Sequence, residues 1–316
     1  MTLTPHSDRR TFMSRAFAGA LALSGLTACA APVPKAPARK APTDELLALE
    51  AKSQGRLGVG ILDTAAGELV GHRQDERFAM CSTFKLPLAA EVLRDVDAGR
   101  RKLDQFIAYS KADMVSHAPV TGANLAAGGM TIGDLAKATQ ITSDNPAANL
   151  IIRELGGPLA VTQRFRLAGD PVTRIDRYEP MMNFVVGDDP RDTTSPAAMA
   201  GLIARYLTTD YLSKPSKDLL IGWMIETRTG AKRLRAGFPP EWKAGDKTGT
   251  GMADGMLDKY NDVAIFWPPA RPPVIVTAFY EADGKYEQSR DADQAALADV
   301  GRIAAAQVAA WNGGRD

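Results

Sequence analysis

Strand-like segments lie at both ends of this chain, and a long helical block separates them. Near the N-terminus, residues 55–73 read GRLGVGILDTAAGELVGHR, which predicts two strands around a turn at 65–67. Near the C-terminus, WKAGDKTGT, NDVAIFWPP and PVIVTAFYEA predict three more strands. We therefore expect one antiparallel five-stranded sheet built from both chain ends.

The block between these strands predicts a separate helical lobe. It is rich in Ala and Leu and is broken by Gly/Pro/Asp loops, as in TIGDLAKATQITSDNPAANLIIREL. Helices are also predicted at 44–54 and 291–311, next to the strands. The expected fold is α/β of the α+β type, with an α/β lobe formed by 44–79 and 230–316 and a helical lobe at 80–229. A functional site would lie in the groove between the lobes.

Composition excludes several classes of function. With 38 Lys and Arg against 37 Asp and Glu, the net charge is +1, so nothing in the charge favours a nucleic acid partner. His6, His72 and His117 are far apart, and neither Cys29 nor Cys81 belongs to a pair with metal-ligand spacing. We expect no metal, no organic cofactor and no internal disulfide framework.

Residues 1–29 have the features of an export signal. Arg9 and Arg10 are followed by an apolar run rich in Ala, Leu and Gly, as in twin-arginine signals. The run ends in LTAC, which resembles a lipobox and would place a lipid on Cys29, although ACA can also be read as an ordinary cleavage site. Residues 30–43 are basic and rich in Pro and Ala, which is typical of a linker. We expect a periplasmic protein, tethered to a membrane if Cys29 is lipidated.

Four short motifs carry side chains that are suited to catalysis. They are S-x-x-K at Ser82 and Lys85, S-D-N at 143–145, DRYEPMMN at 176–183 and K-T-G at 247–249. Each has an ordinary structural explanation: a helix cap, an Asx turn, a salt-bridged surface turn and a solvated edge-strand lysine. Ser82 and Lys85, however, share one face of a helix, so the lysine can act as a base for the serine if its charged form is disfavoured.

Together and in this order, the motifs resemble those of the class A serine β-lactamases, which belong to the penicillin-recognising serine enzymes. The resemblance extends over residues 44–316 and includes SHAPVT, RDTTSPAAMA, DKTGTG and NDVAIFWP. It implies a hydrolase that opens the β-lactam ring through an acyl-serine and confers β-lactam resistance. It also implies a small-molecule β-lactam as partner and a monomer that needs no cofactor.

The resemblance further implies a role for each residue of the motifs. Ser82 would be the nucleophile, and its backbone N–H together with that of Thr250 would form the oxyanion hole. Ser143 would pass a proton to the departing β-lactam nitrogen. The substrate would be bound by Asn145, Lys247, Thr248, Gly249, Thr250 and His117.

Glu179 and Asn183 distinguish enzymes that release the acyl group from those that stay blocked. In the family, a carboxylate paired with an amide holds and deprotonates the water that hydrolyses the ester. Whether Lys85 or Glu179, acting through water, is the base for acylation stays open.

Arg177 and Asp192 match positions whose ion pair closes the neck of the loop that carries Glu179 in this family. A penicillin-recognising peptidase and a β-lactam sensor domain are the alternatives; Glu179 disfavours the first, and the lack of a second membrane or cytoplasmic module disfavours the second.

Several positions depart from the usual family pattern or predict a local feature of the structure. The segment after K-T-G, 251–260, is long and has no arginine, so the guanidinium that binds the substrate carboxylate would come from Arg235, unless that side chain is simply solvated. Gly251 stands where a disulfide-bearing carbapenemase subgroup has its second cysteine, which disfavours that subgroup. Cys81, as the residue before the nucleophile, is expected to be a buried packing thiol. Pro87 lacks an N–H, which predicts a loosened or kinked helix at that point.

Overall fold

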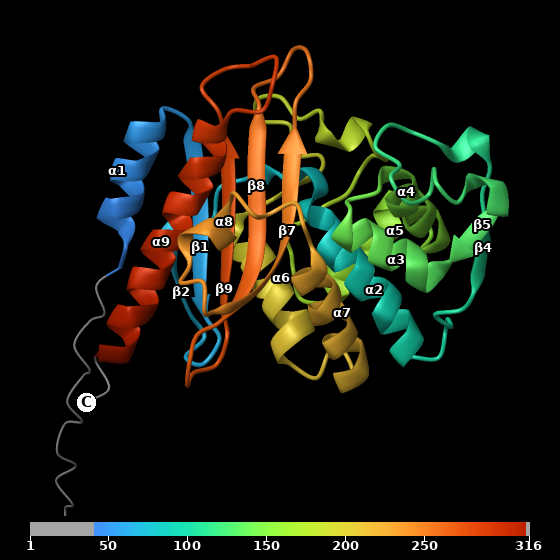
Figure 1. The fold of residues 1–316 in the computed structure, drawn as a ribbon, viewed down its shortest axis with the longest axis horizontal. Helices are drawn as coiled ribbons and strands as arrows, with labels where there is room; N and C mark the ends of the chain where they lie inside the picture. The colour runs from blue at the N-terminus through green and yellow to red at the C-terminus, as the bar shows by residue number, and fades with distance from the viewer. Residues whose placement is uncertain (1–40, 314–316) are drawn as a thin grey trace, which may run out of the picture. The chain divides into compact units, whose positions relative to one another are not determined.

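A five-stranded antiparallel sheet lies at the centre of the described part of the chain (Figure 1). The computed structural model describes residues 41–313, so the predicted export signal, Cys29 and most of the predicted linker lie outside the described residues. The order across the sheet is β2-β1-β9-β8-β7, with bounds Glu68–His72, Arg56–Asp63, Val274–Glu281, Lys259–Trp267 and Lys243–Gly251. Every neighbouring pair is antiparallel, which confirms the predicted sheet built from both ends of the chain.

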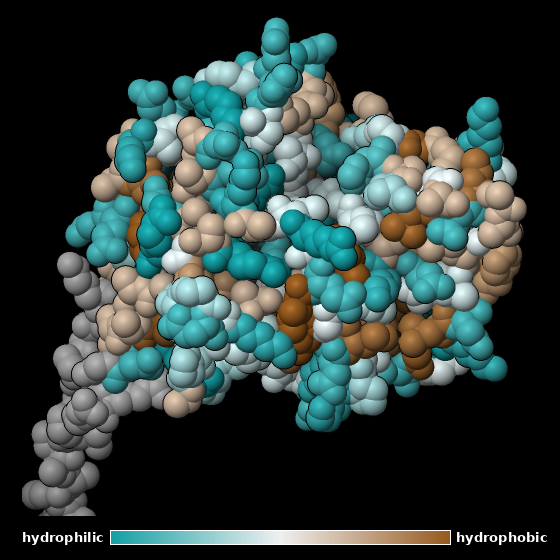
Figure 2. Space-filling view, viewed as in Figure 1, coloured by the Kyte–Doolittle hydropathy of each residue, from teal (hydrophilic) through white to brown (hydrophobic). Residues whose placement is uncertain are grey.

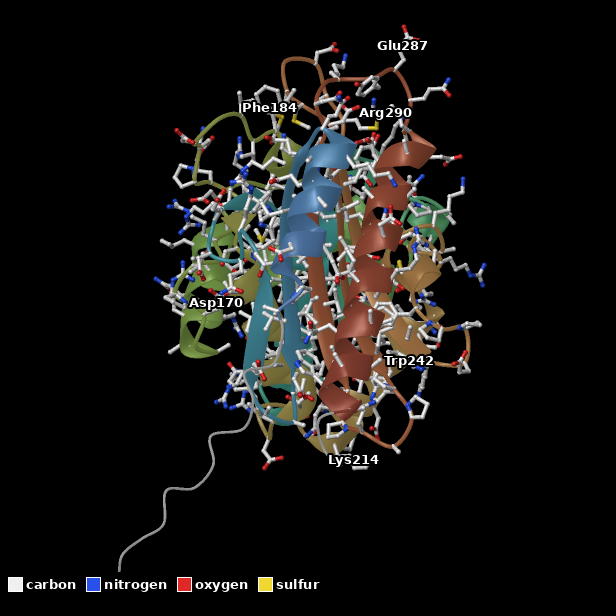
Figure 3. All side chains as sticks on the ribbon, turned by 90° about the vertical axis from the view of Figure 1, so that its left-hand side faces the viewer. Asp170, Phe184, Lys214, Trp242, Glu287 and Arg290 are labelled. Carbon is white, nitrogen blue, oxygen red and sulfur yellow. The ribbon has the colours of Figure 1, made fainter. Side chains whose placement is uncertain are left out.

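Burial on both faces explains the apolar runs of the central strands. Every residue of β8 except Trp267 and every residue of β9 except Glu281 is buried. On the outer face the strands pack against α1 (Thr43–Ser53), α8 (Leu234–Gly237) and α9 (Asp291–Gly313). Figure 3 shows α1 and α9 side by side across this face.

The inner face of the sheet packs against the middle of the chain. Phe279, Ile275 and Val263 belong to one apolar cluster with the helices, which are α2 Lys85–Asp97, α3 Ile132–Ile141, α4 Asn145–Glu154, α5 Pro158–Leu167, α6 Pro196–Thr208 and α7 Lys214–Glu226. Asp144 caps α4 and Ser195 caps α6, each with a proline in the first two helical positions. The predicted helical block is therefore confirmed, and α6 lies directly on β1 and β9.

Short elements complete the connections between these helices. β3 (Phe78–Ala79) pairs with β6 (Thr193–Thr194), and β4 (Phe106–Ala108) pairs with β5 (Gly129–Thr131). The 3-10 turns of the described residues are η1 Cys81–Phe84, η2 Lys111–Asp113, η3 Leu125–Ala127 and η4 Met181–Asn183. Because β3 leads directly into η1, its pairing with β6 brings the segment after the E-P-M-M-N sequence close to the S-x-x-K sequence.

None of the helices between residues 41 and 313 combines the length and the apolar character that crossing a membrane requires. Figure 2 shows the apolar side chains of one face as separate patches among hydrophilic ones.

Candidate active site

Ser82 lies in the 3-10 turn η1, directly before α2. The α-helix begins at Lys85, so Pro87 falls in its first turn, where a missing N–H removes no helical hydrogen bond. The helix that carries Ser82 and Lys85 changes from 3-10 to α geometry between Phe84 and Lys85, within the span of the bond that Pro87 cannot donate to Thr83 O, which agrees with the predicted loosening. The turn still leaves Ser82 and Lys85 on one side.

Lys85 is the centre of a buried network of polar contacts. Its Nζ lies 2.9 Å from Ser82 Oγ, within the reach that a general base for this hydroxyl requires. It donates to Ser143 O at 2.9 Å and to Asn145 Oδ1 at 2.5 Å, and it pairs with Glu179 Oε1 at 2.9 Å. The side chains of Lys85 and Glu179 are fully buried, so these contacts take the place of hydration. Residues from three of the four motifs thus meet at one amine.

Ser143 lies between two lysines. Its Oγ is 3.3 Å from Lys85 Nζ and accepts a hydrogen bond from Lys247 Nζ at 3.1 Å. Its φ of 61° is a left-handed conformation that is uncommon for a residue with a Cβ. Burial and then the charge of Lys85 lower the pKa of Lys247 well below its usual value. Ser143 is therefore in position to exchange a proton with either amine.

Strands β7 and β8 hold the turn that carries the serine. A Cβ at Gly249 would lie 2.7 Å from Met80 O and 3.2 Å from Ser82 N, so only glycine allows β7 to lie this close. Asn261 of β8 donates from Nδ2 to Met80 O at 3.0 Å. The next residue of β7 after this contact is the exposed Thr250, so the end of the strand lies beside the serine.

Two asparagines hold Glu179. Asn183 donates from Nδ2 to Glu179 Oε2 at 2.5 Å. Asn149 of α4 binds the backbone of Glu179 twice: its Nδ2 donates to Glu179 O at 2.9 Å, and its Oδ1 accepts from Glu179 N–H at 2.8 Å. Sequence analysis missed Asn149. The sequence could have indicated it, because Asn149 comes four residues after Asn145 and therefore lies on the same face of the same helix.

The loop that carries Glu179 is closed at its neck by a charged pair. Arg177 Nε donates to Asp192 Oδ2 at 2.5 Å. The Oδ1 atom of Asp192 accepts from the N–H groups of Asp176 and Arg177 at 2.7 and 3.1 Å. Asp192 is fully buried, and this burial raises its pKa.

The two arginines of the sequence RLR have different partners. Arg235, which was expected to bind the substrate carboxylate, pairs with the buried Asp246. Arg233 instead donates to Thr250 Oγ1 at 2.6 Å and to Gly249 O at 2.7 Å. Residues two apart at the start of a helix do not face the same way, so only one of them can reach β7's exposed end. Arg235 is therefore engaged with Asp246, whereas Arg233 is the arginine that contacts the exposed end of β7.

His117 and Asn145 lie around the S-D-N turn. His117 is exposed, and its Nε2 is 2.9 Å from Thr142 O, directly before Ser143. Asn145 uses its Oδ1 on Lys85 and donates from Nδ2 to Ser116 O at 2.9 Å. Both ends of its amide therefore stabilise the turn.

The remaining predicted positions lie behind the serine or along β7. Thr248 Oγ1 is 2.6 Å from Thr229 Oγ1, either of which can donate. Cys81 is a free, buried thiol, and burial raises its pKa to about 12. A Cβ at Gly251 would lie 2.8 Å from Cys81 Sγ, so the two positions are in contact. Within residues 41–313, no group of three His, Cys, Asp or Glu side chains is arranged to hold a metal ion.

Comparison with known proteins gives consistent matches over this region. A sequence profile of the β-lactamase enzyme family matches residues 41–308. β-Lactamase L2 of Stenotrophomonas maltophilia is 46% identical over 302 residues, covering 93% of this chain and 95% of that protein. β-Lactamase AST-1 of Nocardia asteroides is 39% identical over 312 residues, covering 96% and 98%. The solved structure of an ancestral (GNCA) class A β-lactamase has 48% identity and a TM-score of 0.78, and the match covers 83% of this chain and 98% of that one.

Proposed function

The chain belongs to the class A serine β-lactamases, and from that premise we propose that Ser82 opens the β-lactam ring and that Glu179 directs hydrolysis of the acyl-enzyme. As a member of this family the protein is a hydrolase of β-lactams, an activity that confers resistance to them. One observation carries the residue assignment: Lys85 lies 2.9 Å from the Ser82 hydroxyl and forms a fully buried pair with Glu179.

Acylation needs a base for the serine and a proton donor for the leaving nitrogen. Ser82 Oγ attacks the carbonyl carbon of the β-lactam, and the C–N bond of the ring breaks as the ester forms. Lys85, at 2.9 Å, accepts the serine proton directly, or Glu179 accepts it through a water. Ser143 gives a proton to the departing nitrogen and regains one from Lys85 or Lys247, both of which contact its Oγ.

Deacylation needs a water that is held and deprotonated beside the ester. Glu179 is suited to this because its carboxylate is fixed by Asn183 and lies next to Lys85, one contact away from Ser82. Its backbone is held in turn by Asn149. The water attacks the ester carbonyl, Glu179 takes its proton, and that proton returns to Ser82 as the product leaves.

The substrate in this proposal lies along β7. Backbone N–H groups of Ser82 and Thr250 stabilise the oxyanion, and loss of one such donor typically lowers the rate by about 10²–10³. Lys247 and Arg233 supply positive charge for the substrate carboxylate, and Thr248 supplies a hydroxyl. Further contacts come from Asn145, Gly249 and His117.

Turnover distinguishes this function from its two alternatives. The purified protein is mixed with excess chromogenic cephalosporin, and ring opening and intact mass are followed over time. Many turnovers with no lasting adduct support the proposal. A stoichiometric burst with a stable acyl adduct would instead identify a β-lactam-binding peptidase or sensor.

Export, tethering and the monomeric state also belong to the proposal. The paired arginines at 9–10 and the LTAC sequence support a twin-arginine signal and a lipid on Cys29. In cells given a labelled fatty acid, the wild-type protein should incorporate the label and Cys29→Ser should not. Replacing Arg9 and Arg10 by lysine should retain the enzyme inside the cell, and light scattering of the purified protein should give one chain per particle.

A further inference from the structure

Arg233 is a buried guanidinium whose hydrogen bonds all go to uncharged acceptors. It donates to Gly249 O and Asn261 O at 2.7 Å each and to Thr250 Oγ1 at 2.6 Å. In the part of the chain that the structure describes, no ion pair joins it to a carboxylate, unlike Arg235. The charge of Arg233 is therefore left available at the exposed end of β7, where the proposed function requires it.

The backbone next to Arg233 is anchored by a buried residue of β8. Leu234 N–H, the first of α8, donates to Asp262 Oδ2 at 3.1 Å. The first N–H groups of a helix have no partner within the helix, so an outside acceptor fixes how the helix begins. Asp262 lies opposite Thr248 in the pairing of β7 with β8. Asp262 therefore lies on the strand next to the one that carries the K-T-G sequence.

Asp262 provides an acceptor rather than an ion pair. It is fully buried, and among the described residues its Oδ1 has no hydrogen-bond partner. Asp246 is its diagonal neighbour on the same face of the sheet, because Asp246 pairs with Ala264, two residues after Asp262. Burial and the nearby Asp246 raise the pKa of Asp262 well above its usual range, against the opposing effect of the Arg233 charge. Asp246, by contrast, forms an ion pair with Arg235.

We propose that Asp262 is a positioning residue for substrate recognition: its carboxyl oxygen anchors Leu234 N–H and thereby aims Arg233 at the substrate carboxylate. The inference rests on the proposed function, since it concerns the carboxylate subsite of that reaction. An acceptor oxygen is all that this role demands. Asparagine offers the same oxygen without charge, whereas alanine and leucine offer none.

The test compares a chromogenic cephalosporin with the methyl ester of the same compound, which lacks the carboxylate charge. The measured quantity is kcat/KM for the acid divided by kcat/KM for the ester. Asp262→Ala should lower this ratio about 10-fold, mainly through a higher KM for the acid, because a charge-assisted contact is misaligned. Asp262→Asn should keep the ratio of the wild type. Should the alanine variant fail to fold, Asp262→Leu, which has a similar shape, should show the same loss.

Asp258 offers a matched control for the loss of a buried acceptor. It is also fully buried; its Oδ2 accepts from Tyr286 N–H at 2.9 Å, and its Oδ1 has no partner among the described residues. Asp258→Ala should therefore reduce stability but leave the ratio unchanged. In an Arg233→Ala background, adding Asp262→Ala should lower the ratio no further, because both changes remove the same contact.

Two results would overturn the inference while leaving the proposed function intact. One is a folded Asp262→Ala variant with the wild-type ratio, and the other is an Asp262→Asn variant with the low ratio of the alanine variant. A wild-type ratio near one would refute the carboxylate subsite of the proposed function and the inference with it. Absence of turnover on either compound in the wild type would refute the proposed reaction itself.

Discussion

Glu179→Gln removes the carboxylate on which deacylation depends while keeping the shape of the side chain. In the protein both carboxylate oxygens face donors: Asn183 Nδ2 at 2.5 Å and Lys85 Nζ at 2.9 Å. A glutamine amide has one acceptor oxygen and one NH₂ group, so its NH₂ must face one of these donors. The variant therefore loses the proton acceptor for water and also one of the contacts that orient the side chain.

The expected loss is large and falls on one step. A positioned general base is worth about 10²–10⁴ in rate, which is roughly 3–5 kcal/mol of transition-state stabilisation. Lys85 keeps its contacts with Ser82, Ser143 and Asn145 in the variant, so it remains able to serve acylation. We expect kcat to fall by at least about 10²-fold while the ester on Ser82 accumulates.

Stopped-flow absorbance and quenched mass spectrometry check this prediction. The variant should give a burst of one ring opening per enzyme molecule, followed by slow turnover, and a mass increase equal to the substrate. Asp189→Asn is the control, because it makes the same kind of carboxylate-to-amide change at a half-buried position of the same loop, where Asp189 pairs with Arg191. Unchanged kcat without an adduct would refute the role of Glu179. An equal loss in acylation and deacylation would show that Glu179 also serves as the acylation base.

Three further predictions concern other groups. Protonated Lys247 is expected to bind the substrate carboxylate, so kcat/KM should fall as pH rises through its lowered pKa; in Lys247→Arg the guanidinium stays charged, and the alkaline limb of the pH–rate profile should move to higher pH. Arg177→Ala leaves the buried carboxylate of Asp192 without its partner and should lower the free energy of unfolding by about 3 kcal/mol, measured by urea denaturation. Cys81, with a pKa of about 12 and no exposure, should resist alkylation in the folded enzyme and react after unfolding, as peptide mapping can determine.

The sheet could be predicted because each strand carries its own signal. The apolar runs and turn residues identify five strands, and their distribution at the two chain ends leaves one sheet as the simple solution. The helix boundary at Lys85 could not be predicted from Pro87 alone. Proline is disfavoured within a helix and favoured in its first turn, so the residue alone does not say where the α-helix begins.

The site was predictable as a set of motifs and not as a set of contacts. The order of the motifs indicated which side chains would meet, but their distances depend on loops such as the one closed by Arg177 and Asp192. Asn149 forms its hydrogen bonds with the backbone of Glu179, so its role cannot be inferred from a catalytic sequence motif. Arg233 and Arg235 have the same chemistry two residues apart, and sequence alone cannot say which of them faces the substrate.

Buried polar residues in β8 explain how one strand positions both Ser82 and Arg233. In the sequence KYNDVAIFW, Asn261 and Asp262 are adjacent and buried, so each must find a partner on its own face of the sheet. Asn261 donates to Met80 O on the face of η1, and Asp262 accepts from Leu234 N–H on the face of α8. These two adjacent residues of β8 thus hold η1, which carries Ser82, on one face of the sheet and the backbone next to Arg233 on the other face. Asn261 and Asp262, two consecutive polar residues that are both buried in β8, are therefore the feature through which the sheet itself orients the catalytic and the recognition groups.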